Sequence, residues 1–189
     1  MIPRQMSAAA LKAPESPLCL SERSLAFLAY WKEARGRSAL PSPEDIRPSE
    51  LTELLPYLRY MRWDGPERVV FRLWGTGLAE LMKTDLTGLN VFDMLPEREL
   101  ETERVRLKNL HLVPCGFAQQ RRVTDVSGVT RLFEFLTLPV SAGSDGQPRM
   151  IGPGSFVDAV PGERVELADD PKTVIHSFTY LDLGFGIPE

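Results

Sequence analysis

Side chains able to do chemistry are few in this sequence. His111 and His176 are its two histidines, and Cys19 and Cys115 are its two cysteines. Neither His-Glu-x-x-His nor Cys-x-x-Cys spacing occurs, and the glycines at 75–77 lack the span and lysine of a phosphate-binding loop. Acidic residues are numerous, which leaves paired carboxylates open, but nothing singles out a pair. The sequence therefore predicts no catalytic residue and no metal site, and favours a protein that is not an enzyme.

Composition indicates an ordinary globular protein. The 189 residues suit one domain, and 43% hydrophobic with 25% charged residues is neither a disordered nor a fibrous composition. A net charge of −4 weighs against a nucleic-acid partner, because phosphate binding needs a surplus of Lys and Arg on one surface. Unpaired cysteines, and the lack of a signal-peptide core or of an apolar run near the ~20 residues that cross a bilayer, predict a cytoplasmic protein without a membrane partner.

The elements that would position these residues fall into four parts. They are an arm at 1–20, N-terminal helices at 21–54, a main domain at 55–160 and a tail at 161–189. Prolines and small residues in the first part predict a flexible arm. The tail holds an apolar stretch at 174–181, so we expect it to pack on the domain or on a partner.

An amphipathic helix is predicted after the arm. Ser21 can cap it, Leu25, Leu28 and Trp31 recur at helical spacing, and Gly36 ends it. This apolar stripe must be covered by its own domain or by a second copy of the chain.

The main domain alternates strands and helices. The predicted strands cover 57–63, 68–74, 117–125, 130–140 and 149–160. Asp64-Gly65-Pro66-Glu67 supplies the turn of a hairpin between the first two strands. Short helical turns follow, and then a longer helix that Pro96 opens and Pro114 ends. This order is typical of a small α+β domain.

The third and fourth predicted strands indicate one specific contact. If Ser127-Gly128 forms a two-residue turn, Arg121 lies directly opposite Glu134. A salt pair inside an apolar stripe would be a structural pair that sets the register of the two strands. It could also orient a polar ligand.

Several short segments carry a resemblance to a known family. They are Tyr30-Trp31, Leu40-Pro41-Ser42, Leu54-Leu55-Pro56, Arg72-Leu73-Trp74-Gly75-Thr76, Asp85-Leu86-Thr87-Gly88 and Glu134-Phe135-Leu136-Thr137-Leu138-Pro139. With the strand order, they resemble the PAS domain, and more closely a group of stand-alone bacterial PAS-like proteins without an output domain. The resemblance covers about 55–160 and implies a five-stranded antiparallel sheet whose helices, on one face, enclose a small cavity.

The resemblance also implies where ligands and partners would bind. Candidates for the cavity are Trp74, Met82, Phe92, Leu107, His111 and Phe133, which could line it or fill it. PAS domains often dimerise through a helix before the first strand, which makes Leu25, Leu28 and Trp31 candidates for a homodimer interface. Packing within one monomer is the equally weighted alternative.

Cofactor expectations follow from the same resemblance. Some PAS sensors hold haem through a histidine of the long helix, and His111 is the one residue placed to do so, although a hydrogen-bonded structural histidine is the favoured interpretation. The flavin photosensor type needs a cysteine in the short helices after the second strand. The segment 77–95 has none, which weighs against flavin photochemistry.

The sequence thus predicts a non-enzymatic sensory and regulatory module for signal transduction. It would bind a small apolar or amphipathic ligand, form a homodimer, and signal by contact with a protein partner. A haem sensor using His111 and a small enzyme of unknown type are the alternatives.

Overall fold

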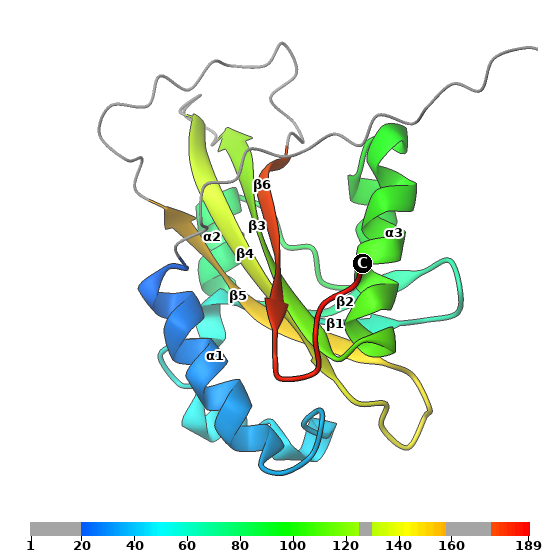
Figure 1. Cartoon of the computed structure of the whole chain (residues 1–189). Helices are drawn as coiled ribbons and strands as arrows, with labels where there is room; N and C mark the ends of the chain where they lie inside the picture. Colours follow the sequence, from blue (N-terminus) through cyan, green and yellow to red (C-terminus); the bar gives the residue numbers. More distant parts are fainter. Residues whose placement is uncertain (1–19, 125–129, 158–174) are drawn as a thin grey trace, which may run out of the picture.

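The computed structural model describes residues 20–124, 130–157 and 175–189, and this part of the chain forms one six-stranded sheet in the order β2-β1-β5-β4-β3-β6 (Figure 1). Every strand pairing is antiparallel. The strands are β1 Leu58–Trp63, β2 Val69–Trp74, β3 Cys115–Thr124, β4 Thr130–Val140, β5 Arg149–Val157 and β6 Ile175–Asp182. The α-helices are α1 Glu22–Arg35, α2 Thr76–Met82 and α3 Glu97–Leu112, and short 3₁₀ turns lie at Pro43–Asp45, Pro48–Glu50, Leu55–Tyr57 and Val91–Met94.

Local signals explain the helix boundaries. Ser21 caps α1 by accepting a hydrogen bond from the Ser24 N–H at 3.3 Å, and Gly36 ends the helix at φ 55°, a left-handed conformation that suits glycine. Pro96 precedes the first turn of α3, where Glu97 and Glu99 favour the positive end of the helix dipole. None of the described helices is both long and apolar enough to traverse a bilayer.

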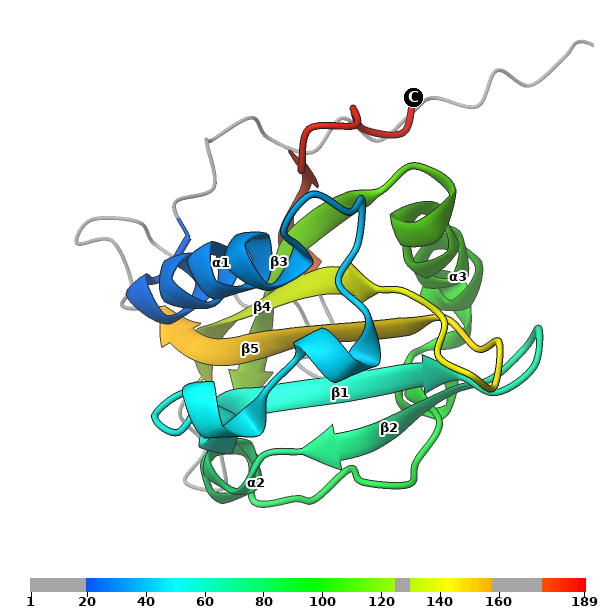
Figure 2. The same ribbon diagram turned by 90° about the horizontal axis from the view of Figure 1, so that it is seen from below.

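Both faces of the sheet are covered: α2 and α3 of the main domain lie on one face, as expected, and the N-terminal helix α1 covers the other. One buried cluster, here called the α3 face, includes Trp74, Leu107 and Phe133 beneath α2 and α3. The other, the α1 face, joins Phe27 and Trp31 of α1 to the opposite side of the strands. Figure 2 shows the short turns between α1 and β1 on the same side as α1. Successive strand residues point to opposite faces, and both sets are apolar here, so both need a cover.

The tail supplies a sixth strand, which corrects the five-stranded expectation. β6 pairs with β3 from Cys115↔Asp182 to Arg121↔Ile175. Phe178 and Tyr180 of β6 pack against the cluster of the α3 face. The apolar character of the tail was visible in the sequence, but its partner strand was not.

The pairing of β3 with β4 corrects the predicted register by one residue. Phe133 lies opposite Arg121, and Glu134 lies opposite Gln120. The turn proposed at Ser127-Gly128 lies outside the described residues. Because side chains alternate along a strand, a shift of one residue places Arg121 and Glu134 on opposite faces of the sheet. The predicted salt pair between them is therefore wrong.

Helix α1 packs within the monomer. Trp31 is fully buried, and its indole Nε1–H donates to the Pro139 carbonyl at 2.9 Å. Leu28 is partly buried against the same cluster, whereas Leu25 is 52% exposed. Intramolecular packing thus accounts for Trp31, and Leu25 remains on the outer surface of the helix.

Replacing Trp31 by alanine should lower the free energy of unfolding by about 3–5 kcal/mol, because it empties a filled site and removes a buried hydrogen bond. Urea denaturation at one fixed protein concentration measures the change. Leu25→Ala is the control on the same helix and should stay within about 0.5 kcal/mol of the parent. Equal losses for the two variants would contradict the packing described for α1.

Candidate functional site

The residues predicted to form a cavity pack together in the core of the α3 face. Trp74, Phe92, Leu107 and Phe133 are each no more than 5% exposed, and Met82 is partly buried against the same cluster. Aromatic rings dominate this core, with ring centroids 5.1 Å apart for Phe71–Trp74, 4.7 Å for Phe133–Phe135 and 6.1 Å for Trp63–Phe92. The structure brings these side chains together, but His111 lies apart from them beside a surface pocket.

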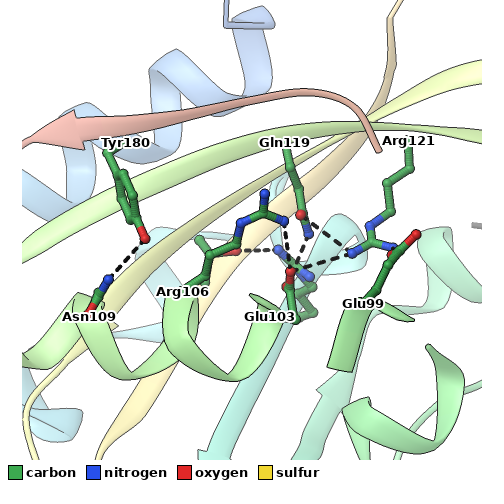
Figure 3. Close-up of polar contacts among 9 residues, drawn as sticks. Glu99, Glu103, Arg106, Asn109, Gln119, Arg121 and Tyr180 are labelled. Atoms are coloured by element: carbon green, nitrogen blue, oxygen red, sulfur yellow. Dashed lines mark hydrogen bonds and ion pairs between the residues drawn. The ribbon is translucent and has the colours of Figure 1, made fainter. Parts of the chain in front are cut away.

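Charged and amide side chains lie buried between α3 and β3 (Figure 3). Arg121 contacts the carboxylates of Glu99 at 3.3 Å and Glu103 at 3.6 Å. Glu103 also accepts from the amide Nε2–H of Gln119 at 3.5 Å and lies 3.5 Å from Arg106. Buried charges are tolerated when they are paired and hydrogen-bonded. These contacts fix the position of α3 on the sheet.

A second buried cation, Arg59, crosses from β1 towards β4. Its Nη2–H groups donate to the Leu136 carbonyl at 3.5 Å and to the Thr137 hydroxyl. Gly152 lies directly opposite Arg59 in β5, and a Cβ there would stand 1.9 Å from the Leu136 oxygen. The next residue, Pro153, has no N–H to donate to β4. The Gly-Pro interruption of β5 therefore makes room for the guanidinium and leaves it a carbonyl to contact.

On the α1 face, a buried carboxylate anchors the first turn of α1. Glu134 is fully buried and accepts from the Ser21 N–H at 3.1 Å, the Ser21 hydroxyl at 2.7 Å and the Ser24 hydroxyl at 2.6 Å. Beside it, Arg23 donates to the hydroxyl of Ser155 at 2.9 Å. A carboxylate at a helix N-terminus is stabilised by the free N–H groups and the helix dipole. Glu134 thus fixes where α1 begins on the sheet.

Two hollows border α3. An open pocket of about 360 Å³ lies near its C-terminal end and is lined by Trp63, Gly65, Pro66, Lys108, His111, Leu112, Gln147 and Pro148. A groove of about 410 Å³ runs between α3 and β6 and is lined by Glu101, Thr102, Val105, Arg106, Phe178 and Tyr180. At the far end of that interface the Asn109 amide donates to the Tyr180 hydroxyl at 3.2 Å (Figure 3).

His111 has a neutral, partly buried imidazole. Burial lowers its pKa to about 4, and its Nε2 has no hydrogen-bond partner among the described residues. Nε2 is also covered by protein atoms, so it is not open to an iron atom in the pocket. The imidazole as it stands does not fit the role of axial haem ligand. The described residues hold no group of three or more His, Cys, Asp or Glu side chains that could bind a metal ion.

Burial also explains the state of the cysteine in the core. Cys115 is fully buried at the start of β3, and desolvation raises the pKa of its thiol to about 11. A thiol this weakly acidic is a poor nucleophile at neutral pH. Cys115 is therefore an inert core residue.

Comparison with known proteins identifies the family. The family model for the PAS domain matches residues 20–153. This chain belongs to the PAS domain family. No curated protein matches it.

Several solved structures of light-oxygen-voltage proteins show a limited similarity. An RNA-binding light-oxygen-voltage receptor matches with 17% identity and a TM-score of 0.44 over 61% of this chain, which corresponds to only 34% of the receptor chain. A fungal LOV domain photoreceptor matches with 13% identity and a TM-score of 0.38, covering 53% of this chain and 74% of its own. A variant of RsLOV matches with 13% identity and a TM-score of 0.40, covering 60% of this chain and 69% of its own. Scores this low carry no conclusion about a flavin or another cofactor, so the cofactor expectations stay predictions.

Sequence reasoning missed three buried polar residues of the α3 face. Phe117, Gln119 and Arg121 are spaced two residues apart, so they share one face of β3. Glu103 lies between Leu100 and Leu107 on the buried stripe of α3. These spacings were available signals. No sequence signal marked Arg59, because its burial depends on Gly152 and Pro153 in β5, which are distant in sequence.

The partly buried imidazole of His111 predicts a specific pH dependence of stability. The folded-state pKa of about 4 lies below the ordinary value of 6.5, so between these values the unfolded chain binds the additional proton. The free energy of unfolding should therefore fall by about 2–3 kcal/mol as the pH drops from 6.5 to 4, and this contribution is fully present above pH 6.5. In His111→Gln this component should be missing. Denaturation of both proteins across this range measures the difference, and a constant difference would contradict the assignment.

Proposed function

We propose that this PAS domain is a non-enzymatic sensory and regulatory module of the bacterial cytoplasm. It binds a small amphipathic ligand on the α3 face and passes the signal through α1 to a protein partner. PAS domains as a class are sensory signalling modules, and the fold agrees with that role. The ligand, the partner and the direction of the signal are the proposal.

The single observation that supports this proposal is the alternation of side chains along β4. Phe133 and Phe135 point into the core of the α3 face, whereas Glu134 between them holds the first turn of α1 on the other face. A ligand that moves either aromatic ring also displaces the backbone of β4. Because the anchoring carboxylate sits on that same backbone, α1 would respond. One strand thus links the input face to the output helix.

The two alternatives, a haem sensor that uses His111 and a small enzyme, have less support than the proposed sensory role. The covered Nε2 of His111 does not favour a haem sensor. The pocket beside α3 brings His111 and Lys108 together with no carboxylate in its lining, so it offers no acid–base pair for a small enzyme. That this chain is not an enzyme remains a prediction.

A ligand for the α3 face should stabilise the fold and also change the exchange of α1 amides. A thermal-shift screen with a metabolite library should yield a compound that, at about a hundred times its Kd, raises the melting temperature by roughly 5–10 °C. Hydrogen–deuterium exchange with that compound should then show altered protection in 22–35 as well as in β4. In Glu134→Gln the compound should still bind, but the change in α1 should be smaller. A library that shifts nothing, or a hit that leaves α1 unchanged, would contradict the proposal.

The proposed homodimer would use the outer surface of α1, where Leu25 is 52% exposed. Leu25→Asp should raise the dimer dissociation constant at least about tenfold, because it places a charge in an apolar contact. Sedimentation equilibrium over a range of concentrations measures this. Val105→Asp, at an exposed aliphatic position on α3, is the matched control and should leave the dimer intact. A parent chain that is monomeric at high concentration would remove the dimer from the proposal.

A further inference from the structure

Two buried N–H donors of the α3 face have no hydrogen-bond partner among the described residues. They are Nε of Arg59 and Nε1 of Trp74. The two residues are only 6% and 5% exposed, so bulk water does not satisfy these groups. A buried donor without an acceptor costs free energy and is rare in native proteins. Two of them in one core indicate that an acceptor belongs there.

The two donors come from adjacent positions. Arg59 and Trp74 lie directly opposite each other in the β1–β2 hairpin, so their side chains share one face of the sheet. Both also contact the same aromatic ring, that of Phe135. The Arg59 Cζ lies 4.3 Å from the ring centroid, and the Trp74 and Phe135 centroids are 6.3 Å apart. An acceptor placed beside Phe135 would therefore lie near both side chains.

The charge of Arg59 indicates what kind of acceptor fits. Burial lowers the pKa of its guanidinium to about 9, so the group remains a cation at neutral pH. Its hydrogen bonds go to a carbonyl and a hydroxyl, both neutral, and it forms no ion pair with a described residue. The other buried cation of this face, Arg121, has two carboxylate partners. The carboxylates of Glu99 and Glu103 are balanced by Arg106 and Arg121, which leaves Arg59 without a carboxylate partner among the described residues.

We infer that Arg59 and Trp74 form a subsite for the carboxylate of a small monocarboxylic acid with an apolar body. One oxygen would accept from the Arg59 Nε–H and the other from the indole N–H of Trp74. The inference rests on the proposed function and specifies the ligand class for the same face. A carboxylate that accepts hydrogen bonds from a guanidinium and a second N–H donor gains the strength of charge-assisted bonds.

The surroundings limit the ligand to one negative charge and an apolar remainder. Glu103 raises the pKa of Arg59 through its charge and Arg121 lowers it, so these two neighbours offset each other and Arg59 is left as the one cation of the subsite, which suits a single carboxylate better than a dianion such as phosphate. The apolar body of the ligand would lie against apolar side chains of the same cluster, which would form the walls of the subsite. They include Phe71, Leu78 and Phe135, and the partly buried Ala79, Leu81 and Met82 of α2. An alkyl or aryl chain suits such walls.

The hydrogen bonds of Nη2 do not account for the unpartnered donors. They explain why the guanidinium reaches towards Leu136 and Thr137, but they leave Nε unpaired. They offer nothing to the indole N–H of Trp74. One enclosed water molecule is the competing acceptor, and the experiment must distinguish it from an acid.

The test uses the full-length chain and matched pairs of probes. These are straight-chain acids from butyric to decanoic and arylalkanoic acids from phenylacetic to phenylbutyric, each beside its primary amide. An acid should bind at least about tenfold more tightly than its amide in calorimetric titration. Trp74→Phe should weaken acid binding about tenfold and leave amide binding nearly unchanged. Arg59→Gln should remove the preference for the acid.

The indole signals give a direct readout that does not depend on affinity. The chain has three tryptophans, and the Trp74 signal in an ¹H–¹⁵N spectrum is assigned by its loss in Trp74→Phe. Binding of an acid should shift the Trp74 N–H downfield. Trp31, whose N–H already donates to the Pro139 carbonyl, should not move. Because Trp74→Phe retains an aromatic ring at this position, the spectroscopic measurement can be made even if Arg59→Gln fails to fold.

Three outcomes would overturn the inference. Acids and amides that bind equally would show that Arg59 does not select a charge. Acids that bind without shifting the Trp74 signal would place the site elsewhere. A contact between the Trp74 N–H and water that persists with every acid present would assign both donors to a buried water molecule. In each case the proposed sensory role stands if another compound from the library stabilises the chain and changes α1.

Discussion

The position of α1 depends on one fully buried carboxylate. Glu134 has no cation among its hydrogen-bond partners, and its charge is balanced by the N–H and hydroxyl of Ser21, the hydroxyl of Ser24 and the positive end of the helix. Without these partners a buried charge would be prohibitively costly, so the carboxylate and the first turn of α1 must stay together. Once that turn is held, Phe27 and Trp31 further along the helix reach the sheet and cover its second face.

On the α3 face, in contrast to Glu134, most buried charges form ion pairs. Arg106 and Arg121 pair with Glu99 and Glu103 between α3 and β3, so two cations balance two carboxylates, and this network ties the long helix to the sheet. Arg59 is held by neutral acceptors at a place where β5 is interrupted by Gly152 and Pro153. One face therefore combines a balanced charge cluster with an unbalanced cation. A protein that needed only a stable core would gain by replacing such a cation with an apolar residue.

Particular residues show which parts of the fold could be predicted from the sequence. Ser21, Gly36 and Pro96 are local signals, and they placed α1 and α3 correctly because capping and φ preferences act within a few residues. The hairpin between β1 and β2 and the strand patterns of β3 to β5 followed from alternation and turn chemistry in the same way. The register of β3 on β4 could not be predicted in this way. It depends on the length of the connection between the two strands, and a turn motif alone does not determine that length. A shift of one residue was enough to separate Arg121 from Glu134.

By itself, the sequence determined the family, the order of the helices and of the first five strands, and the apolar residues of the core, because each of these is encoded in local periodicity and short motifs. Only the tertiary structure decided that β6 joins β3, that α1 covers the second face, and which buried charges meet. Those outcomes depend on contacts between residues far apart in the chain, such as Ser24 with Glu134 or Arg59 with Thr137. The free energy of a buried polar group is set by the partners that the fold brings to it, and no local pattern contains that information.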